Sequence, residues 1–478
     1  MAGYGMAGAR LAEEIRRRDP AGDRVRLTVL GAERHPPYNR VLLPGVLAGS
    51  LPAHGTRLQD ADWGAEHAVD VRLGRAVVAI DRTGRRVRLD DSATLRYDAL
   101  VLATGARARV PETDGLLDGG GELAPGVVTF RTVDDCERIV SAARSGAQVA
   151  VLGGGPLGLE TARGLAARGS RVTVVHPAGH LMERQLDRGA GQVLASTLRR
   201  LGIELRLGVP AGRYLPGDGL KLEDGGHVPA QLLVVSAGVL PETGLATAAG
   251  LAVGRGVLVD SALRTSDANI YAIGDCAQHP GAVSGLVQPA WDQAEVLADL
   301  LTGADPAASY RGTRTVMRLK ARDVDLAALG EVRPAVDDPG AEVLCLTDPA
   351  RGRYAKLVVR AGLVAGAIVL GLPDAAATIA QFYDRGLPVP GDRLALLLGR
   401  AMPSSTGPVA PADLPPCAVV CWCNSVTKAQ LVAAWRRGAA GVAELTTATR
   451  ATTGCGGCRH AVVGIAESLS KQERNRFR

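Results

Sequence analysis

Aromatic side chains are scarce in this 478-residue sequence and make up only 3% of it. There is also no uninterrupted run of about 18 apolar residues, the length that a membrane-spanning helix needs. The start lacks the basic-then-apolar pattern of a secretory signal. Basic residues are scattered and the formal net charge is only +6, which disfavours nucleic acid as a partner. These absences predict a cytoplasmic protein with no membrane or nucleic-acid partner. The length of 478 residues predicts about three or four domains.

Cysteine is absent from the first 135 residues and crowded near the end. The first is Cys136, and four of the eight cysteines fall within the last 60 residues. Without a secretory signal, clustered cysteines indicate metal or redox chemistry in a reducing compartment, and they disfavour structural disulfides.

A glycine motif after a short apolar run is the strongest single feature. Val149–Leu152 suits a buried parallel strand, and Gly153, Gly155 and Gly158 then give G-x-G-x-x-G at the turn into a helix. A second strand is expected at Arg171–His176. Strand, glycine turn, helix and strand together predict a dinucleotide site, because the glycines allow a tight turn and a close approach to pyrophosphate. The alternative is a glycine-rich turn without a ligand.

A second G-x-G-x-x-G stands at the N-terminus. It consists of Gly3, Gly5 and Gly8, and a helix is expected from there to about residue 18. The next strand, Val25–Leu30, leads to Glu33, whose carboxylate is placed to hydrogen-bond the ribose of an adenine dinucleotide.

The strand that should precede this first glycine turn is missing. Only Met1 and Ala2 come before the motif, although the first strand of such a fold is central in its sheet. Its loss should expose the neighbouring strands. We therefore expect the true start to lie several residues upstream; the alternative is weak dinucleotide binding.

Several further strands are expected to end beside the same ligands. Strands at 70–80, 86–89 and 97–102 should form a small antiparallel meander that leads into Thr104 and Gly105. Gly238 ends a later strand in the same way, and Asp275 follows the strand 270–273, at the carboxyl end where open α/β sheets bind ligands. Arg40 is a candidate phosphate contact or, equally, a solvated loop arginine.

These motifs together resemble a known family over about residues 1–400. The paired glycine turns, Thr104-Gly105, Ala237-Gly238 and T-S-D-A-N-I-Y-A-I-G-D-C-A resemble the two-dinucleotide-domain flavoprotein reductases. The resemblance implies an α/β fold with two Rossmann-like domains, an FAD-binding domain at 1–112 and 243–310 and an inserted NAD(P)H-binding domain at 113–242. It implies FAD contacts at Gly3, Gly5, Gly8, Glu33, Arg40, Thr104, Gly105 and Asp275. It implies nicotinamide-nucleotide contacts at Gly153, Gly155, Gly158 and Glu160. Gly238, the second strand-end glycine, is a further candidate cofactor-binding residue.

Differences from other members of this family exclude some classes of flavoprotein reductase. Because Cys136 is the first cysteine, an early C-x4-C pair or a single flavin-side cysteine is excluded, and with it a disulfide reductase or a peroxidase. Relatives often carry Ser-Lys or Ser-Ser where this chain has Leu43-Pro44-Gly45, so a cation near the flavin is not carried over. An acidic residue at the end of the second strand would favour NADH. His176 stands there, which permits NADPH or dual use, or merely caps the strand.

The C-terminal third carries the cysteine cluster. Residues 311–402 resemble the small α+β interface domain of the same reductases, and 403–416 is a linker by composition. Four thiolates in two tight pairs can hold a [2Fe–2S] cluster, and residues 417–470 are similar to the bacterioferritin-associated ferredoxin-like domain, a small helical domain. The expected ligands are Cys421, Cys423, Cys455 and Cys458. A structural zinc site and a C-G-G-C dithiol pair remain as alternatives.

The parts predict a route for electrons from NADH or NADPH through FAD and the [2Fe–2S] cluster to an acceptor. No acid–base side chain is needed, because the cofactors carry the chemistry. The domain order resembles the N-terminal half of the NAD(P)H nitrite reductase large subunit and the electron-transfer subunit of assimilatory nitrate reductase. The sequence shows no sirohaem or molybdopterin domain, so the expected acceptor is a separate nitrate or nitrite reductase protein.

Two other functions stay open at this point. One is a reductase for a rubredoxin, ferredoxin or dioxygenase system, and the other is a non-enzymatic flavin and iron–sulfur redox sensor. A homodimer is compatible with the resemblance.

Overall fold

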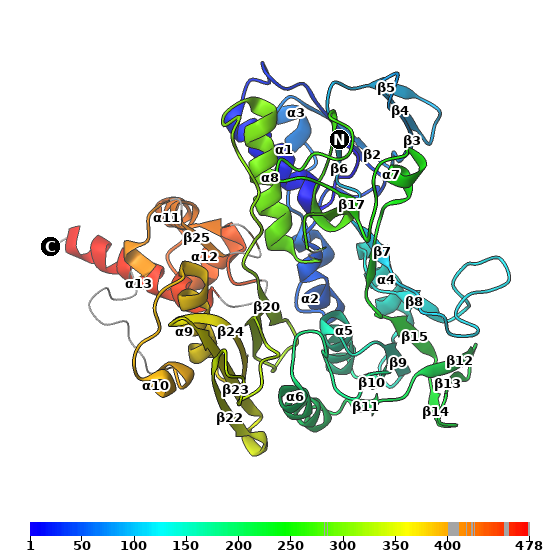
Figure 1. Ribbon diagram of the computed structural model, residues 1–478, viewed down its shortest axis with the longest axis vertical. Coiled ribbons are helices and arrows are strands. Elements are labelled where there is room, and N and C mark those ends of the chain that lie inside the picture. The colour runs from blue at the N-terminus through cyan, green and yellow to red at the C-terminus, as the bar shows by residue number, and fades with distance from the viewer. Residues whose placement is uncertain are drawn as a thin grey trace.

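The structure is a computed structural model that describes residues 1–281, 283, 285–399, 411–416, 418–421, 424, 426–453 and 458–476. Its elements form four units, which we call the N-terminal, central, α+β and C-terminal units (Figure 1). The predicted α/β fold with two Rossmann-like units is confirmed. The domain boundaries given above stay predictions. Across the described residues, no helix combines the length and apolar character required to cross a bilayer.

The N-terminal unit joins two stretches of chain in one sheet. Its strands are all parallel, in the order β2, β1, β6 and β18, with Ala2 between β1 and β6. Helices α1 and α8 lie side by side, and their apolar faces share one core with the sheet (Figure 1). The elements are α1 (Met6–Arg18), β1 (Leu27–Gly31), α2 (Leu43–Leu47), α3 (Trp63–Glu66), β2 (Val69–Leu73), β3 (Val77–Asp81), β4 (Arg86–Leu89), β5 (Thr94–Arg96), β6 (Leu100–Leu102), β7 (Ala106–Ala108), β16 (Val239–Pro241), α7 (Gly244–Ala248), β17 (Val257–Leu258), β18 (Ile270–Ala272), β19 (Ala277–Gln278) and α8 (Val287–Thr302).

Ala2 alone occupies the place of the central strand. It forms parallel bridges with Leu30 and Leu102, and its N–H donates to the Val101 carbonyl at 2.8 Å. Leu30 and Leu102 are 3% and 1% exposed, so the expected exposure of the neighbouring strands is not observed. The upstream start stays a prediction.

The expected antiparallel meander was partly wrong. The stretch 70–80 is two strands in different sheets, since β2 pairs in parallel with β1 and only β3 joins the antiparallel sheet with β4 and β5. Gly74, with φ +65°, lies between them. Of the stretch 97–102, only β6 is a strand, and it returns to the main sheet beside β18. Alternating apolar residues do not distinguish a parallel edge strand from an antiparallel one.

The central unit is a parallel sheet in the order β11, β10, β9, β15 and β8. The predicted strand Arg171–His176 is β10, and the glycine helix is α5, with Pro156 at its start. An antiparallel hairpin sheet, β12 to β14, was not predicted. The elements are β8 (Val127–Thr129), α4 (Val133–Ala142), β9 (Gln148–Leu152), α5 (Pro156–Ala167), β10 (Arg171–His176), α6 (Arg188–Arg200), β11 (Glu204–Leu207), β12 (Ala211–Leu215), β13 (Gly219–Leu222), β14 (His227–Pro229) and β15 (Leu232–Val235).

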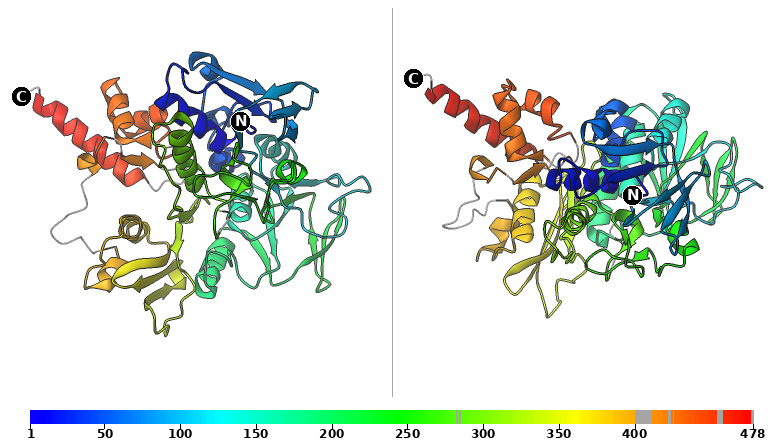
Figure 2. Two further views of the ribbon diagram at one scale, coloured as in Figure 1. Left: turned by 45° about the horizontal axis from the view of Figure 1, so that its top comes forward. Right: turned by 90° about the horizontal axis from the view of Figure 1, so that it is seen from above.

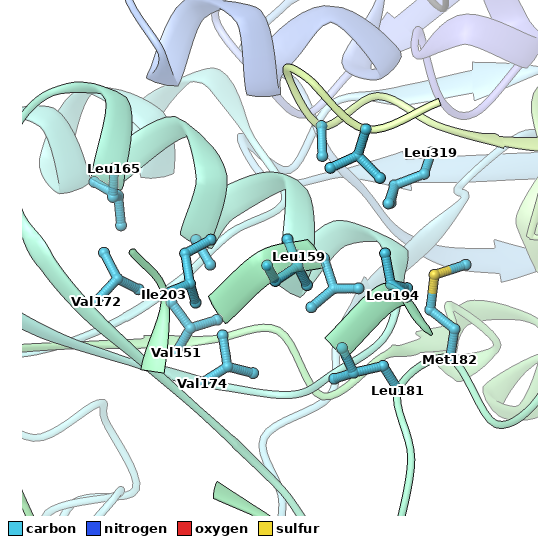
Figure 3. Packing of buried hydrophobic residues seen from close by; sticks show 14 of the residues in the cluster. Val151, Leu159, Leu165, Val172, Val174, Leu181, Met182, Leu194, Ile203 and Leu319 are labelled. Atoms are coloured by element: carbon cyan, nitrogen blue, oxygen red, sulfur yellow. The ribbon is translucent and has the colours of Figure 1, made fainter. Parts of the chain in front are cut away.

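The core of the central unit lies between its sheet and the helices α5 and α6. Val151 and Val174 on the strands face Leu159 on α5 (Figure 3), and all three are fully buried. Leu194 on α6 packs beside Leu181 and Met182 of the loop after β10 (Figure 3). Most side chains of this core are aliphatic, as the scarcity of aromatics requires, although Phe130 is also buried in it.

The α+β unit is an antiparallel sheet in the order β20, β21, β24, β23 and β22. Strands β23 and β24 form a hairpin with Ala361 and Gly362 in its turn, and α9 packs on β24. Leu319 joins the core of the central unit (Figure 3). The elements are β20 (Val316–Leu319), β21 (Leu326–Gly330), β22 (Glu342–Asp348), β23 (Arg353–Arg360), β24 (Leu363–Leu370), α9 (Pro373–Arg385) and α10 (Arg393–Leu397).

The C-terminal unit is small and mainly helical. Its helices are α11, α12 and α13, which agrees with the small helical domain expected for residues 417–470. In both views of Figure 2, α13 extends away from the rest of the molecule. The elements are β25 (Val419–Cys421), β26 (Val426–Thr427), α11 (Lys428–Arg436), α12 (Val442–Thr449) and α13 (Arg459–Arg476).

Candidate functional site

A large cleft of about 3240 Å³ runs between the units. It is lined by both glycine turns, by α5, by the β20–β21 segment and by one edge of the C-terminal unit. The cofactor-contact residues predicted from sequence line it, except Gly8 and Gly158. The tertiary structure thus brings two sites that lie 150 residues apart into one space.

The first glycine turn fits a bound pyrophosphate. Gly3 has φ +114°, and a Cβ there would stand 2.1 Å from the Ala103 carbonyl oxygen. A Cβ on Gly8 would stand 2.3 Å from the Gly3 carbonyl oxygen. At Gly5 the nearest atom is 4.0 Å away, on Arg40. Two glycines therefore close the turn, and the middle one leaves its surface open to a ligand.

The second turn repeats this geometry. Gly153 has φ +131°, and its Cβ would lie 2.3 Å from the Ser236 carbonyl oxygen, while a Cβ on Gly158 would lie 2.0 Å from Gly153 O. Nothing lies within 4 Å of a Cβ on Gly155. The N-terminus of α5 starts here, and its backbone N–H groups favour an anion.

Glu33 lies at the end of β1 beside the first turn. Its carboxylate accepts a hydrogen bond from the Tyr38 hydroxyl at 2.6 Å and forms an ion pair with Arg40. Arg40 is only about one-quarter exposed and lies over the Tyr38 ring, so it is not a solvated loop arginine. Burial raises the pKa of Tyr38. Tyr38 was not singled out from the sequence.

Asp275 is paired with an arginine that the sequence analysis missed. The Arg131 Nη2 atom lies 2.6 Å from Asp275 Oδ2, and each side chain is about one-fifth exposed. Arg131 follows β8 and precedes the capping box of α4, in which Thr132 and Asp135 satisfy each other's backbone. The capping box predicts only where α4 begins, and no local signal places Arg131 beside Asp275.

Thr104 and Gly105 lie where the chain crosses between the N-terminal and central units. The Thr104 hydroxyl donates to the Glu242 carbonyl at 3.0 Å, and the Glu242 N–H donates to Gly105 O at 2.9 Å. Arg109 N–H donates to Gly238 O at 2.9 Å. The two strand-end glycines are thus joined through the β7–β16 pair, and a Cβ on either would meet nothing within 4 Å.

Glu160 projects from α5 and is 5% exposed. Its Oε1 atom accepts the Lys320 backbone N–H at 2.8 Å and lies 3.8 Å from Lys320 Nζ. Burial raises the pKa of Glu160, and the Lys320 ammonium opposes that rise. Lys320 directly follows β20 in the α+β unit, 160 residues after Glu160. No local sequence pattern could therefore have predicted this pair.

His176 ends β10 and is buried. Its Nε2 atom lies 2.9 Å from Glu183 Oε2, and its Nδ1 atom has no hydrogen-bond partner among the described residues. Both side chains line the cleft beside the second glycine turn. His176 is therefore more than a strand cap.

Two of the four predicted cluster ligands can be placed. Cys421 ends β25 and Cys458 precedes α13, and both are buried. The Thr452 N–H lies 3.2 Å from Cys458 Sγ, and Asn424 Nδ2 lies 3.8 Å from Cys421 Sγ. Such donors stabilise thiolate sulfur, so these residues fit a metal cluster. Cys423 and Cys455 lie outside the described residues.

One hydrogen bond links this cysteine region to the N-terminal unit. Asn39 Nδ2 donates to Asn424 Oδ1 at 3.0 Å, and Asn39 directly precedes Arg40 of the first cofactor site. The Asn424 amide also donates to the Arg450 carbonyl at 2.6 Å. The cysteine region therefore lies against the first dinucleotide site.

Comparison with known families matches three successive parts of the chain. Residues 316–383 match the rubredoxin NAD+ reductase C-terminal domain, and residues 419–468 match the BFD-like [2Fe-2S] binding domain. Residues 2–294, more than half of the chain, match the pyridine nucleotide-disulphide oxidoreductase family.

Similar curated proteins fall into two groups. The chain is 32% identical to nitrite reductase [NAD(P)H] of Bacillus subtilis, over 98% of the chain and 57% of that protein. It is also 32% identical to the assimilatory nitrate reductase electron transfer subunit of B. subtilis, over 99% of the chain and 60% of that protein. It is 39% identical to the anthranilate 1,2-dioxygenase system ferredoxin–NAD(+) reductase component of Burkholderia cepacia, over 64% of the chain and 75% of that protein. The chain spans less than two thirds of the first two relatives.

Solved structures agree with the fold. The putidaredoxin reductase–putidaredoxin complex is similar with a TM-score of 0.72 and 25% identity, over 82% of this chain and 94% of that one. A ferredoxin reductase from Rhodopseudomonas palustris has a TM-score of 0.68 and 29% identity, over 77% of this chain and 90% of that one. With the paired glycine turns on one cleft and a [2Fe–2S] domain beside it, the chain belongs to the pyridine nucleotide-disulphide oxidoreductase family and is an FAD-dependent NAD(P)H oxidoreductase.

Proposed function

We propose that this chain takes electrons from NAD(P)H and delivers them, through its [2Fe–2S] domain, to a separate nitrate or nitrite reductase protein in nitrate assimilation. The observation that carries this proposal is the extent of similarity. The likeness to the nitrite reductase and to the nitrate reductase electron transfer subunit runs through 98% and 99% of the chain. The likeness to the dioxygenase-system reductase covers 64%.

The proposal assigns FAD to the N-terminal unit. When bound, the flavin accepts a hydride from the nicotinamide and releases electrons singly. The turn closed by Gly3 and Gly8 presents backbone to the pyrophosphate at Gly5. Ribose and ribityl contacts fall to Glu33 and Asp275. The remaining proposed contacts are Arg40, Thr104 and Gly105.

The nicotinamide nucleotide is assigned to the central unit. The α5 N-terminus would hold its pyrophosphate, because Gly155 leaves room there and Gly153 and Gly158 close the turn. Glu160 lies one turn further along α5 and, fixed by Lys320, borders the space between the two nucleotide sites. Gly238 and His176 complete the proposed set.

The cluster is assigned to Cys421, Cys423, Cys455 and Cys458. The described donors, Thr452 N–H and the Asn424 amide, support thiolate ligands at two of these positions. The contact between Asn424 and Asn39 supports passage of electrons from the flavin side to the cluster in this arrangement.

The test uses purified protein with NADH or NADPH and three acceptors: methyl viologen, a ferredoxin, and a nitrate reductase catalytic subunit. We expect the catalytic subunit to accept electrons faster than the ferredoxin. The double variant Cys421→Ser, Cys423→Ser should lose this delivery and keep NAD(P)H oxidation with ferricyanide. Faster turnover with the ferredoxin would contradict the nitrate assignment.

A second candidate is a reductase for a ferredoxin or rubredoxin. The 39% identity to the dioxygenase-system reductase and the match to the rubredoxin reductase C-terminal domain favour it. The same three-acceptor assay separates the two. Cytoplasmic location and a homodimer remain part of the proposal.

A further inference from the structure

The acidic residue expected at the adenosine end of the second nucleotide site is not at its usual place. In such folds a carboxylate about 20 residues after the glycine turn binds the ribose 2′-hydroxyl of NAD. Here β10 ends with the imidazole of His176. The side chains beside this imidazole must then provide the hydrogen bonds to the ribose hydroxyls.

The loop after β10 folds back onto the glycine turn. Met182 has φ +54°, and its N–H donates to the Gly154 carbonyl at 3.0 Å. The His176 ring lies 2.7 Å from the place of a Cβ on Gly154. Leu181 and Met182 are fully buried beside Leu194 (Figure 3). The next residue, Glu183, is therefore fixed close to the turn and does not sit on a free loop.

The side chain of Glu183 is held at one end and accessible to a ligand. His176, 8% exposed, engages Glu183 Oε2 at 2.9 Å, while 37% of the Glu183 side chain is exposed. Glu183, Arg184 and His176 all line the cleft with the glycine turn. A carboxylate thus stands at the adenosine end of the site, although it lies seven residues later than the strand end.

We infer that Glu183, oriented by His176, accepts hydrogen bonds from the adenosine ribose hydroxyls and makes the protein prefer NADH over NADPH. A carboxylate accepts a hydrogen bond from the 2′-hydroxyl, whereas the 2′-phosphate of NADPH brings a second negative charge to the same place. Glu183 is the specificity residue, and His176 is its positioning residue. The inference rests on nucleotide binding in the central unit and not on the identity of the acceptor.

The test compares Glu183→Gln with Glu204→Gln. Glu204 starts β11, is exposed, and lies outside the cleft lining, so the control removes the same charge from the same unit. We expect Glu183→Gln to lower the NADH-to-NADPH ratio of kcat/KM, with ferricyanide as acceptor, by about 10- to 100-fold, as for loss of a charge-assisted hydrogen bond. Arg184, exposed on the same cleft, should then tolerate the phosphate.

Binding measurements give a readout apart from turnover. Isothermal titration with 5′-AMP and 2′,5′-ADP should show the same change in preference for Glu183→Gln and none for Glu204→Gln. His176→Phe, which keeps a ring against Gly154, should change the preference in the same direction, and the double variant should add little to it. A change below about threefold in Glu183→Gln, or an equal change in Glu204→Gln, would overturn the inference. Loss of the acceptor reaction alone would not affect the inference about Glu183, but it would count against the proposed function.

Discussion

At the scale of single residues, the glycines of each motif do different work. A Cβ on Gly158 would overlap the Gly153 carbonyl oxygen at 2.0 Å, whereas a Cβ on Gly155 meets nothing within 4 Å. The first is needed for the turn to close, and the second only for a ligand to approach. Sequence spacing treats the two positions alike.

A matched pair of variants separates these roles. We expect Gly158→Ala to destabilise the protein by roughly 1–3 kcal/mol, because backbone must shift to relieve the overlap. Gly155→Ala should leave thermal unfolding nearly unchanged and raise the KM for NADH, since its methyl group would occupy the space proposed for the pyrophosphate. Thermal unfolding and steady-state kinetics measure both. Equal losses of stability would contradict the division of roles.

The buried Glu160 carboxyl, paired with the partly exposed Lys320, should give a pH dependence of stability. Burial raises the pKa of Glu160 in the folded state, so the folded protein holds this proton more tightly than the unfolded chain. Stability from this group is therefore complete below the unfolded pKa of about 4.3 and falls as the pH rises toward the folded value. The Lys320 ammonium limits that fall.

The substitution Lys320→Met should increase the loss of folding stability that accompanies ionisation of Glu160. Without the ammonium, we expect roughly 1–3 kcal/mol less stability at pH 8 than in the wild type, and a smaller difference at pH 4, where Glu160 is protonated. Urea unfolding at the two pH values measures this. The double variant with Glu160→Gln should recover most of the loss, and a deficit of the same size at both pH values would speak against a charge effect.

At the scale of elements, one aspartate ties α6 to the α+β unit. Asp187 accepts the Ala190 N–H at 2.9 Å as N-cap of α6, and it also accepts the Tyr354 hydroxyl at 2.7 Å and Lys356 Nζ at 3.0 Å. Burial would raise the pKa of Asp187, but these hydrogen bonds outweigh it, and its pKa lies below the usual value. The cap and the contact between units therefore share one carboxylate.

Replacement of Asp187 should lower the free energy of unfolding more than replacement of an aspartate that only caps a helix. Asp392 caps α10 through Ala395 N–H at 2.9 Å and is exposed. We expect Asp392→Ala to lose about 1 kcal/mol and Asp187→Ala about 2–4 kcal/mol, because the buried Lys356 also loses its partner. Denaturant unfolding of both variants measures the difference. Similar losses would show that the contact between units adds nothing.

At the scale of the whole molecule, the C-terminal unit lies against the N-terminal unit through Asn39 and Asn424. The proposed acceptor protein would also have to reach the cluster. Within the linker predicted at 403–416, Pro411–Asp413 form a short helix that packs on α13. The part of the predicted linker before it would allow this unit to serve both positions.

Shortening this linker should therefore affect the rate of electron delivery and the rate of flavin reduction differently. Deletion of residues 404–409 should slow electron delivery to the acceptor protein more than it slows flavin reduction by NAD(P)H. Stopped-flow flavin absorbance and steady-state turnover measure the two steps. Replacement of the same residues by an equal length of Gly and Ser is the control and should change neither rate strongly; equal slowing of both steps by the deletion would refute a mobile unit.

The local sequence determined a large part of this protein. Glycine turns and apolar runs determined α5, β10 and the β23–β24 hairpin, because each depends on residues within one short stretch. The family resemblance that the cysteine spacing and the paired motifs carry predicted FAD, NAD(P)H and a [2Fe–2S] cluster, which the family matches confirm.

Only the tertiary structure decided which distant side chains meet. Arg131 pairs with Asp275 across 144 residues, Lys320 with Glu160 across 160, and Asn39 with Asn424 across 385. It also placed β2 in the parallel sheet and β3 outside it. The physical reason is that local propensity and periodicity describe one segment at a time, whereas these pairs depend on which surfaces the folded units bury against each other.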